Sequence, residues 1–221
     1  GPTGSGKSTS LYAALKEIKS ERTNITTVED PVEYQLDGVN QVQVFEDIGL
    51  TFGSTLRSIL RQDPDVLLIG EIRDGETADI AVKFALTGHL VFSTVHANDA
   101  PGTITRLLDI GIAPFLVGSC LNLVMAQRLV RRICKNCKNE YAPTNEELAL
   151  VGLDSSKVSG PLFKGEGCAE CRNTGYKGRL AIFEMIPMAR DLRKLVFDNA
   201  NEDEIRTASL NNGMTTLREA G

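Results

Sequence analysis

The stretch GPTGSGKST at residues 1–9 decides the fold, because it matches a phosphate-binding loop over its whole length. Glycines at positions 1, 4 and 6 let backbone N–H groups turn inward around phosphate oxygens. Lys7 is placed to reach the β- and γ-phosphates, and the Ser8 hydroxyl is a ligand for Mg²⁺. The predicted cradle consists of Gly1, Pro2, Thr3, Gly4, Ser5, Gly6, Lys7, Ser8 and Thr9.

The residues that follow the loop, STSLYAALKEIKSER at 8–22, have helical character. The N-terminus of such a helix directs partial positive charge at the same anion. A loop followed at once by a helix is the context that distinguishes a nucleotide site from a chance glycine-rich turn. A strand normally feeds this loop, so we expect the chain to be part of something longer.

Extended and helical segments alternate from the loop to about residue 130. The run DVLLIG at 65–70 is continuously apolar, as expected of a parallel strand buried on both faces. The segment 32–44 is expected to form an excursion or a hairpin, since Asp37-Gly38 is a strong turn signal. The pattern predicts an α/β fold with a parallel sheet and a site at its carboxyl edge. Strands are expected at 24–30, 65–70 and 89–97, and helices at 51–62 and 76–88.

Composition limits the class of partner. With 221 residues, 42% of them hydrophobic, the chain can bury a large core in more than one compact unit. A net charge of −5 gives no global electrostatic case for nucleic acid, and the absence of Trp argues against base-stacking platforms. The apolar stretch 112–130 contains Pro, Ser, Asn and Gln, which favours a buried helix running into a strand over a membrane span.

The character of the sequence changes near residue 131. The chain becomes polar, loop-rich and cysteine-bearing, and Thr144 with Glu147 resembles a capping box that opens a short helix. An apolar strand at 179–188 and surface helices at 189–197 and 201–213 are expected afterwards. We therefore expect a core at 1–130, a cysteine-bearing subdomain at 131–178 and a C-terminal strand and helical region at 179–221.

Acidic residues follow two of the expected strands. Nucleotide hydrolysis requires one carboxylate near the metal and another that orients or deprotonates the attacking water. The alternative is that these acids are solvated strand-end charges or helix caps, an interpretation favoured for Glu29 and Asp74. The candidates are Glu29, Asp30 and Glu33 in VEDPVE, and Glu71 in VLLIGEIRD, where Gly70-Glu71 takes the place in which Asp is usual.

The two histidines, His89 and His96, bracket the strand expected at 89–97. Seven residues apart, they would point to opposite faces and lie roughly 23 Å apart on a fully extended strand. They therefore belong to different sites unless the chain bends. His96, at the carboxyl end, is placed to sense the γ-phosphate or an adjacent carboxylate, whereas His89 is expected to be structural or at an interface.

Four blocks stand in order along the chain: GPTGSGKST, TTVEDPVEY, LRQDPDVLLIGEIRD and LTGHLVFSTVHANDA. Together they resemble the Walker A motif, the aspartate box, the atypical Walker B motif and the histidine box of the ATPases that power type II secretion and type IV pilus assembly. The resemblance covers almost the whole chain. It implies a RecA-like P-loop ATPase domain, and the atypical Gly70-Glu71 is what this family shows.

The resemblance also implies roles and partners. Glu33 would activate the hydrolytic water, Glu71 would be the Walker B carboxylate near Mg²⁺, and His96 would face the phosphates. The family forms hexamers with ATP between this domain and a preceding N-terminal domain, which supplies most phosphate-neutralising arginines. Arg57, Arg61 and Arg73 lie near the right blocks, but each is equally explained as an ion-pair partner of local acids.

Four of the five cysteines form two C-x-x-C pairs, and Cys120 is most simply a small core residue. Paired thiolates on short loops suit tetrahedral Zn²⁺, and four cysteines leave no open position for catalysis. Disulfides would need an oxidising compartment, and nearby Lys and Arg residues would offset the site's charge or bind phosphate, nucleic acid or a protein. Such an insertion resembles the secretion and pilus-extension members of the family. The predicted ligands are Cys134, Cys137, Cys168 and Cys171.

The main hypothesis is an ATP-hydrolysing hexameric motor that uses ATP, Mg²⁺ and structural Zn²⁺. It would act at the cytoplasmic face of the inner membrane on secretion or pilus platform proteins, as a peripheral protein that does not bind nucleic acid. The second hypothesis, from another class, is a nucleic-acid translocase or DNA-uptake ATPase with a zinc ribbon. Salt-dependent DNA binding with DNA-stimulated ATPase would favour the second.

Overall fold

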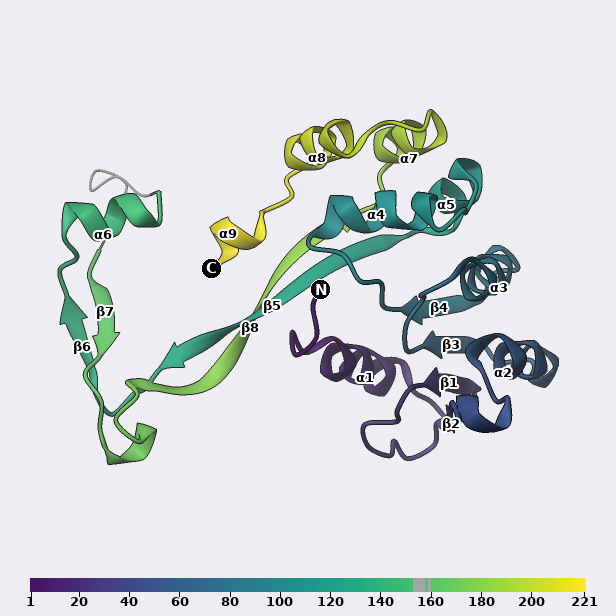
Figure 1. Cartoon of the computed structure of the whole chain (residues 1–221), viewed down its shortest axis with the longest axis horizontal. Helices are drawn as coiled ribbons and strands as arrows, with labels where there is room; N and C mark the ends of the chain where they lie inside the picture. The colour runs from purple at the N-terminus through teal and green to yellow at the C-terminus, as the bar shows by residue number, and fades with distance from the viewer. Residues whose placement is uncertain (153–157, 159) are drawn as a thin grey trace. The chain divides into compact units, whose positions relative to one another are not determined.

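The computed structural model describes residues 1–152, 158 and 160–221 and divides the chain into two compact units (Figure 1). The first unit comprises Gly1–Arg128 and Ile182–Gly221, and the second comprises Leu129–Ala181. Residues 153–157 and 159, within the subdomain predicted at 131–178, lie outside the described residues. Among the described residues, no helix combines the length and hydropathy needed to cross a bilayer.

A parallel sheet of four strands in the order β2-β1-β3-β4 organises the first unit. Register aligns Val28 with Ile69, and Ile69 with Ser93, so the strands end together. Residues that follow them therefore meet at one edge, although they are far apart in sequence. The strands are β1 (Ile25–Glu29), β2 (Asn40–Gln43), β3 (Val66–Ile69) and β4 (Leu90–Ser93).

Helices cover both faces of this sheet because side chains alternate along each central strand. On one face, α1 (Lys7–Ile18) packs Tyr12 and Leu15 in a cluster with Ile25, Val66 and Leu68. On the other face, α2 (Phe52–Ile59) and α3 (Gly75–Leu86) pack in a cluster with Val28, Leu67 and Ile69. Each fully buried aliphatic side chain contributes about 1.5–3 kcal/mol, so the two-sided core holds β1 and β3 firmly.

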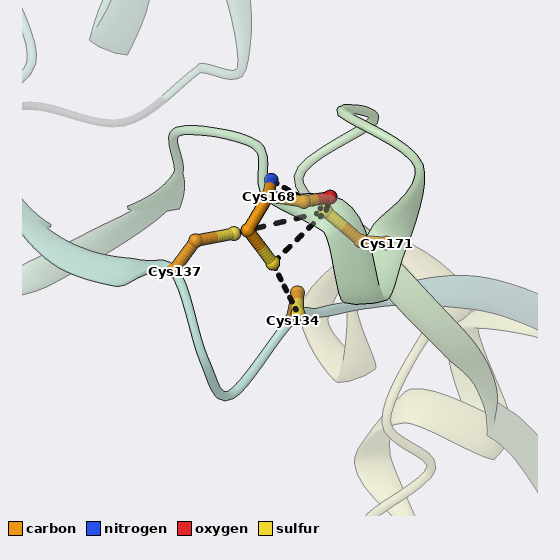
Figure 2. A group of neighbouring side chains, drawn as sticks. All are labelled: Cys134, Cys137, Cys168 and Cys171. Carbon is orange, nitrogen blue, oxygen red and sulfur yellow. Dashed lines mark hydrogen bonds between the residues drawn. The ribbon is translucent and has the colours of Figure 1, made fainter.

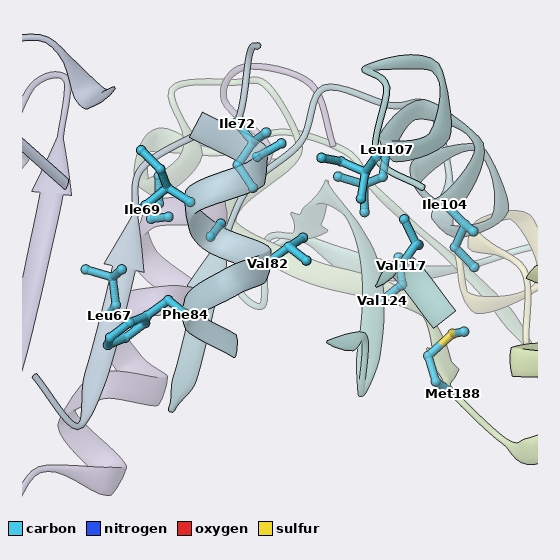
Figure 3. Close-up of a cluster of buried hydrophobic side chains, with 14 of the residues drawn as sticks. Leu67, Ile69, Ile72, Val82, Phe84, Ile104, Leu107, Val117, Val124 and Met188 are labelled. Carbon is cyan, nitrogen blue, oxygen red and sulfur yellow. The ribbon is translucent and has the colours of Figure 1, made fainter. Parts of the chain in front are cut away.

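The larger core continues from the sheet to a second layer of helices. Figure 3 shows Leu67, Ile69, Ile104, Leu107, Val117, Val124 and Met188 in this continuous cluster. Glu184 is buried beside it, where its carboxylate accepts bonds from the backbone N–H groups of Ala100 and Leu217. The helices are α4 (Ala100–Asp109), α5 (Pro114–Cys120), α7 (Arg190–Phe197), α8 (Glu202–Asn211) and α9 (Leu217–Ala220).

The second unit contains the cysteine pairs and a small antiparallel pair of strands. Strands β6 (Lys138–Tyr141) and β7 (Leu162–Gly165) pair, and α6 (Asn145–Leu150) opens on the predicted capping box of Thr144 and Glu147. The long strands β5 (Leu123–Ile133) and β8 (Tyr176–Pro187) form a separate two-stranded sheet, and each strand has residues in both units. Short 3₁₀ turns occur at Glu46–Ile48, Leu60–Gln62 and Ala169–Cys171.

The structure decides one local alternative and shortens one expected strand. Of the two alternatives for the segment 32–44, it shows the excursion and not the hairpin, because β2 runs parallel to β1; residues 30–39 form the crossing loop, with the expected turn at Asp37-Gly38. The strand predicted at 89–97 is shorter, and β4 is only half-buried because it is an edge of the four-stranded sheet. The predicted helix running into a strand at 112–130 is confirmed by α5 and β5.

Candidate functional site

The phosphate loop has the backbone conformation that an anion cradle requires. Gly4 and Gly6 have φ values of 77° and 88°, a left-handed region that favours glycine. Helix α1 begins directly after Gly6, with no side chain capping its N-terminus and no acid in its first turn. Its first N–H groups and its dipole are therefore directed at an anion rather than at the chain's own side chains.

Lys7 folds back across the loop. Its Nζ donates hydrogen bonds to the carbonyl oxygens of Gly1 at 2.6 Å and Pro2 at 3.0 Å. Burial lowers the pKa of Lys7; the charge of Glu71 opposes this shift, and the charge of Arg128 adds to it. The ammonium group is thus held at the cradle by weak acceptors that a phosphate would displace.

Glu33 lies directly beside the start of α1. The Ser8 hydroxyl donates a hydrogen bond of 3.3 Å to Glu33 Oε1, so the crossing loop after β1 meets the phosphate loop. Glu33 itself is exposed and reaches the site from the solvent side. The structure therefore brings together two residues that the sequence placed in separate blocks.

Glu71 follows β3, and 14% of its side chain is accessible to solvent. It bonds to Arg73, and His96 Nε2 lies 3.1 Å from its Oε2. Asp30 lies 3.7 Å from the same Arg73 guanidinium. The Arg73 hydrogen bond, aided by His96, outweighs burial and holds the pKa of Glu71 below its ordinary value. The carboxylate is therefore kept ionised for contact with a cation or a water.

The remaining predicted residues lie elsewhere or act differently. Asp74 caps α3 through a 2.8 Å bond from the Thr77 N–H, which is the helix-cap alternative. Glu29 is not a solvated charge, because only 4% of the residue is exposed. The His89 ring stacks on the Phe84 ring with centroids 4.2 Å apart, and Arg57 forms an ion pair with Glu76. In the described part of the chain, therefore, neither side chain contacts the phosphate loop.

Two residues on β5 complete the surroundings of the loop, although the sequence did not single them out. Gln127 accepts a 2.8 Å bond from the Ser10 hydroxyl, and its carbonyl leaves no room for a Cβ at Gly1. Arg128 lies close to Gly1 and bonds to the backbone carbonyl of Asn98. In the sequence, Gln127 and Arg128 are only a polar pair after an apolar run. Many strands end in this way, so the pattern does not indicate a nucleotide site.

The four paired cysteines form one cluster in the second unit (Figure 2). Their sulfur atoms all lie within 4.8 Å of one another, with close pairs at 3.7 and 3.8 Å. A tetrahedron with Zn–S distances of about 2.3 Å has sulfur atoms about 3.8 Å apart, whereas a disulfide needs about 2.05 Å. The donor set and its spacing fit a tetrahedral zinc ion and not disulfides.

Local backbone geometry arranges these sulfurs. Gly167 and Gly175 donate backbone N–H bonds of 3.3 Å to Cys137 and Cys171, as is expected around thiolates. Gly165 and Gly175 approach so closely that a Cβ on either would overlap the other's backbone. Several nearby basic residues have other partners: Arg131 lies over the Tyr176 ring, and Lys177 pairs with Glu170.

A phosphate loop leading into a helix, a parallel sheet and carboxylates at its carboxyl edge define an α/β nucleotide-binding protein of the P-loop class. The chain matches, over residues 1–221, the family described as Type II/IV secretion system protein, and it belongs to that family. The resemblance drawn from the four sequence blocks is thereby confirmed.

Individual relatives agree with this assignment. The chain is 52% identical over 223 residues to the type IV pilus assembly ATPase PilB of Myxococcus xanthus, covering 100% of this chain and 39% of that protein. It is 48% identical over 221 residues to type II secretion system protein E of Pseudomonas aeruginosa, covering 100% of this chain and 44% of that protein. The chain thus spans less than half the length of these relatives.

Solved structures confirm the predicted fold class. The pilus retraction motor PilT with bound ADP superposes with a TM-score of 0.66 at 29% identity, covering 100% of this chain and 58% of that one. The ATPase DotB of Legionella pneumophila gives a TM-score of 0.63 at 22% identity, covering 100% and 51%, which shows the shared fold alone.

Proposed function

We propose that this chain is the nucleotide-hydrolysing part of an ATP-driven motor for pilus or pseudopilus assembly. The observation that carries the proposal is the convergence of Glu33 on Ser8, beside a phosphate loop, with Glu71 and His96 paired at the same sheet edge. Phosphoryl transfer to water needs positioned charges more than covalent chemistry, and this edge supplies them. The names of PilB and type II secretion protein E support the biological setting.

Each site residue has a role that its geometry suits. The backbone of residues 1–9 and Lys7 would hold the phosphates of ATP, and Ser8 and Glu71 would hold Mg²⁺, which neutralises charge on the transferred group. Glu33 would accept a proton from the attacking water or orient it. His96, bonded to Glu71, would sense the γ-phosphate. Arg73 keeps Glu71 ionised.

The second unit would hold a structural zinc ion through Cys134, Cys137, Cys168 and Cys171, as the sulfur spacing supports. Four protein ligands leave no position for a substrate, so the ion stabilises the fold rather than reacting. We assign hydrolysis to residues 1–130, zinc binding to 131–178 and a supporting role to 179–221. Among the described residues, no other group of three or more His, Cys, Asp or Glu side chains is arranged to hold a metal ion.

Membership of the family supports a proposal for the partners. We propose that the whole protein acts as a homo-hexamer in the cytoplasm, peripheral to the inner membrane, with a preceding domain and membrane platform proteins as its contacts. A DNA-uptake ATPase or nucleic-acid translocase is less well supported, since the relatives named above are secretion and pilus-assembly proteins and the net charge is −5.

The test is turnover by the full-length protein. We expect Glu33→Gln and Glu71→Gln each to lower kcat by about a hundredfold or more while ATP binding remains measurable. Glu21→Gln, a change at an exposed acid of the loop after α1, is the control and should leave kcat unchanged. Wild-type turnover in the Glu71→Gln variant would overturn the assignment.

A further inference from the structure

Glu29 is a buried carboxylate whose described hydrogen-bond donors are all neutral. Its oxygens accept bonds from the Tyr12 hydroxyl, from Thr27 Oγ1 at 2.6 Å and from Gln41 Nε2 at 3.3 Å. No Lys, Arg or His among the described residues lies within ion-pair distance of it. Burying an acid without a cation is costly, and nothing in the proposed chemistry uses Glu29 directly. The burial of the Glu29 carboxylate therefore needs an explanation other than a direct part in hydrolysis.

The Tyr12 hydroxyl is the centre of this network. It donates its single proton to Glu29 and accepts bonds from the Glu33 backbone N–H at 3.4 Å and from Gln41 Nε2 at 3.3 Å. Burial and the neighbouring Glu29 raise the pKa of Tyr12, so the phenol keeps its proton near neutral pH. The direction of all three bonds is thus fixed.

Gln41 extends the network along the crossing loop. Its Nε2 donates to the Tyr34 carbonyl at 3.2 Å, and its Oε1 accepts from the Leu36 N–H at 2.6 Å. The Tyr34 ring also lies edge-on to Tyr12, with ring centroids 4.8 Å apart. The loop that carries Glu33 is therefore fastened at Tyr34 and Leu36, directly after that residue.

Helix α1 connects this network with the phosphate loop. Ser8 and Tyr12 are four residues apart and lie on the same face of the helix. Ser8 contacts the Glu33 side chain, and Tyr12 contacts the Glu33 backbone. One face of one helix thereby locates the proposed water-activating residue at two points relative to the phosphates.

We infer that Tyr12 and Glu29 are positioning residues for Glu33. The inference rests on the proposed function, since it concerns the same hydrolytic step. Glu29 fixes the Tyr12 hydroxyl, and the hydroxyl fixes the loop at Glu33, so that the carboxylate meets water in line with the bound phosphate. Losing the network should impair the chemical step and leave nucleotide affinity intact, because none of these side chains belongs to the cradle.

The test uses the full-length protein and Tyr12→Phe, which removes only the hydroxyl. We expect kcat to fall about tenfold, because small displacements of a reacting group are costly, with the Kd for ADP unchanged. Tyr34→Phe is the matched control. Tyr34 is 48% exposed and contacts Tyr12 and Gln41 through its ring and carbonyl, both of which phenylalanine keeps, so this variant should retain wild-type kcat. A wild-type kcat for Tyr12→Phe would overturn the inference.

A double-mutant cycle distinguishes positioning from general damage. In a Glu33→Gln background, Tyr12→Phe should cause no further loss of residual turnover, since the residue to be positioned is already disabled. An additional tenfold loss there would mean a merely structural role. If Glu33→Gln itself keeps wild-type turnover, the proposed function fails. If Glu33→Gln lowers turnover but Tyr12→Phe leaves it at the wild-type value, only the positioning inference fails.

A second variant covers the possibility that Tyr12→Phe does not fold. Gln41→Met keeps the side chain's length at the half-buried strand β2 but removes its bonds to Tyr12, Glu29 and the loop. It should reproduce the loss of kcat at unchanged ADP affinity. Full activity in the folded Gln41→Met protein would contradict the inference.

Discussion

His96 Nε2 lies 3.1 Å from Glu71 Oε2, which joins the segment after β4 to the end of β3. The pairing follows from the parallel register, because Ile69 and Ser93 are aligned neighbours two and three residues before these side chains. Arg73 approaches the same carboxylate from the other side. Arg73 and His96 therefore keep the Glu71 carboxylate ionised and hold it at the end of β3.

The first prediction concerns the charge state of Glu71. Arg73→Gln should destabilise the protein near neutral pH, since Arg73 is the largest cause of the lowered Glu71 pKa. A lowered carboxylate pKa contributes stability above the unfolded value of 4.5 and loses it as pH falls through the folded value. The difference in urea midpoint between variant and wild type should therefore shrink in acid.

The control for this experiment is Arg57→Gln, which breaks a more exposed pair with Glu76. Exposed pairs of this kind are worth about 0–1 kcal/mol, so the control should change the midpoint little at any pH. A difference for Arg73→Gln that persists unchanged in acid would show that its effect does not pass through Glu71.

Arg128 should contribute to nucleotide affinity. Its charge is close enough to the cradle to lower the pKa of Lys7, and a bound polyphosphate would relieve that repulsion. We expect Arg128→Ala to weaken ADP binding by about fivefold to tenfold, corresponding to roughly 1–1.4 kcal/mol. Titration with a fluorescent ADP analogue measures it, with the exposed Arg106→Ala as control. Equal affinities in both variants would contradict a role for Arg128.

Metal removal should unfold the second unit selectively. Because structural zinc sites contribute folding free energy directly, chelation or Cys137→Ser should raise hydrogen exchange throughout residues 129–181. Purified protein should contain one zinc per chain by elemental analysis. Cys120 lies outside the cysteine cluster and packs against the main core, so the control variant Cys120→Ser should retain one zinc per chain. Less than half a zinc per chain in wild type would argue against the site.

Gly165 should be required for zinc binding. A Cβ at this position would overlap the Gly175 carbonyl, so Gly165→Ala must displace backbone next to the cysteines. We expect a loss of about 2–3 kcal/mol together with reduced zinc content. Gly49→Ala has open space around its Cβ and only a strained φ of 77°, so it should cost about 1 kcal/mol and leave zinc unchanged.

Much of this site could be predicted because it depends on local patterns. The phosphate loop, the helix after it and the carboxylates at strand ends are each specified by a short, continuous stretch of sequence. Side-chain partners between distant segments could not be predicted in the same way. Glu29 was interpreted as a solvated strand-end charge or a helix cap and Tyr12 was not singled out, and only the registration of α1 on β1 brings the two side chains together. Arg128 was missed for the same reason.

The choice between an excursion and a hairpin at 32–44 could not be made from the sequence for a different physical reason. A turn signal such as Asp37-Gly38 specifies a local reversal but not whether the next strand pairs antiparallel or crosses to run parallel. Here the bonds of Gln41 to Leu36 and Tyr34 hold a crossing loop in place of a hairpin. Tertiary contacts therefore decided the direction of β2.

The parallel sheet also gives this protein a convenient side for labelling. All proposed hydrolytic residues follow the strands, so the turns that precede β3 and β4, at Asp63 and Gly88, lie at the opposite edge. Both residues are exposed; a Cβ at Gly88 would meet no neighbouring atom within 4 Å, but its φ of 97° makes a substitution there strained, so Asp63 is the better position. A fluorophore or a short affinity tag at these turns would report on the protein from the sheet edge opposite the proposed hydrolytic residues.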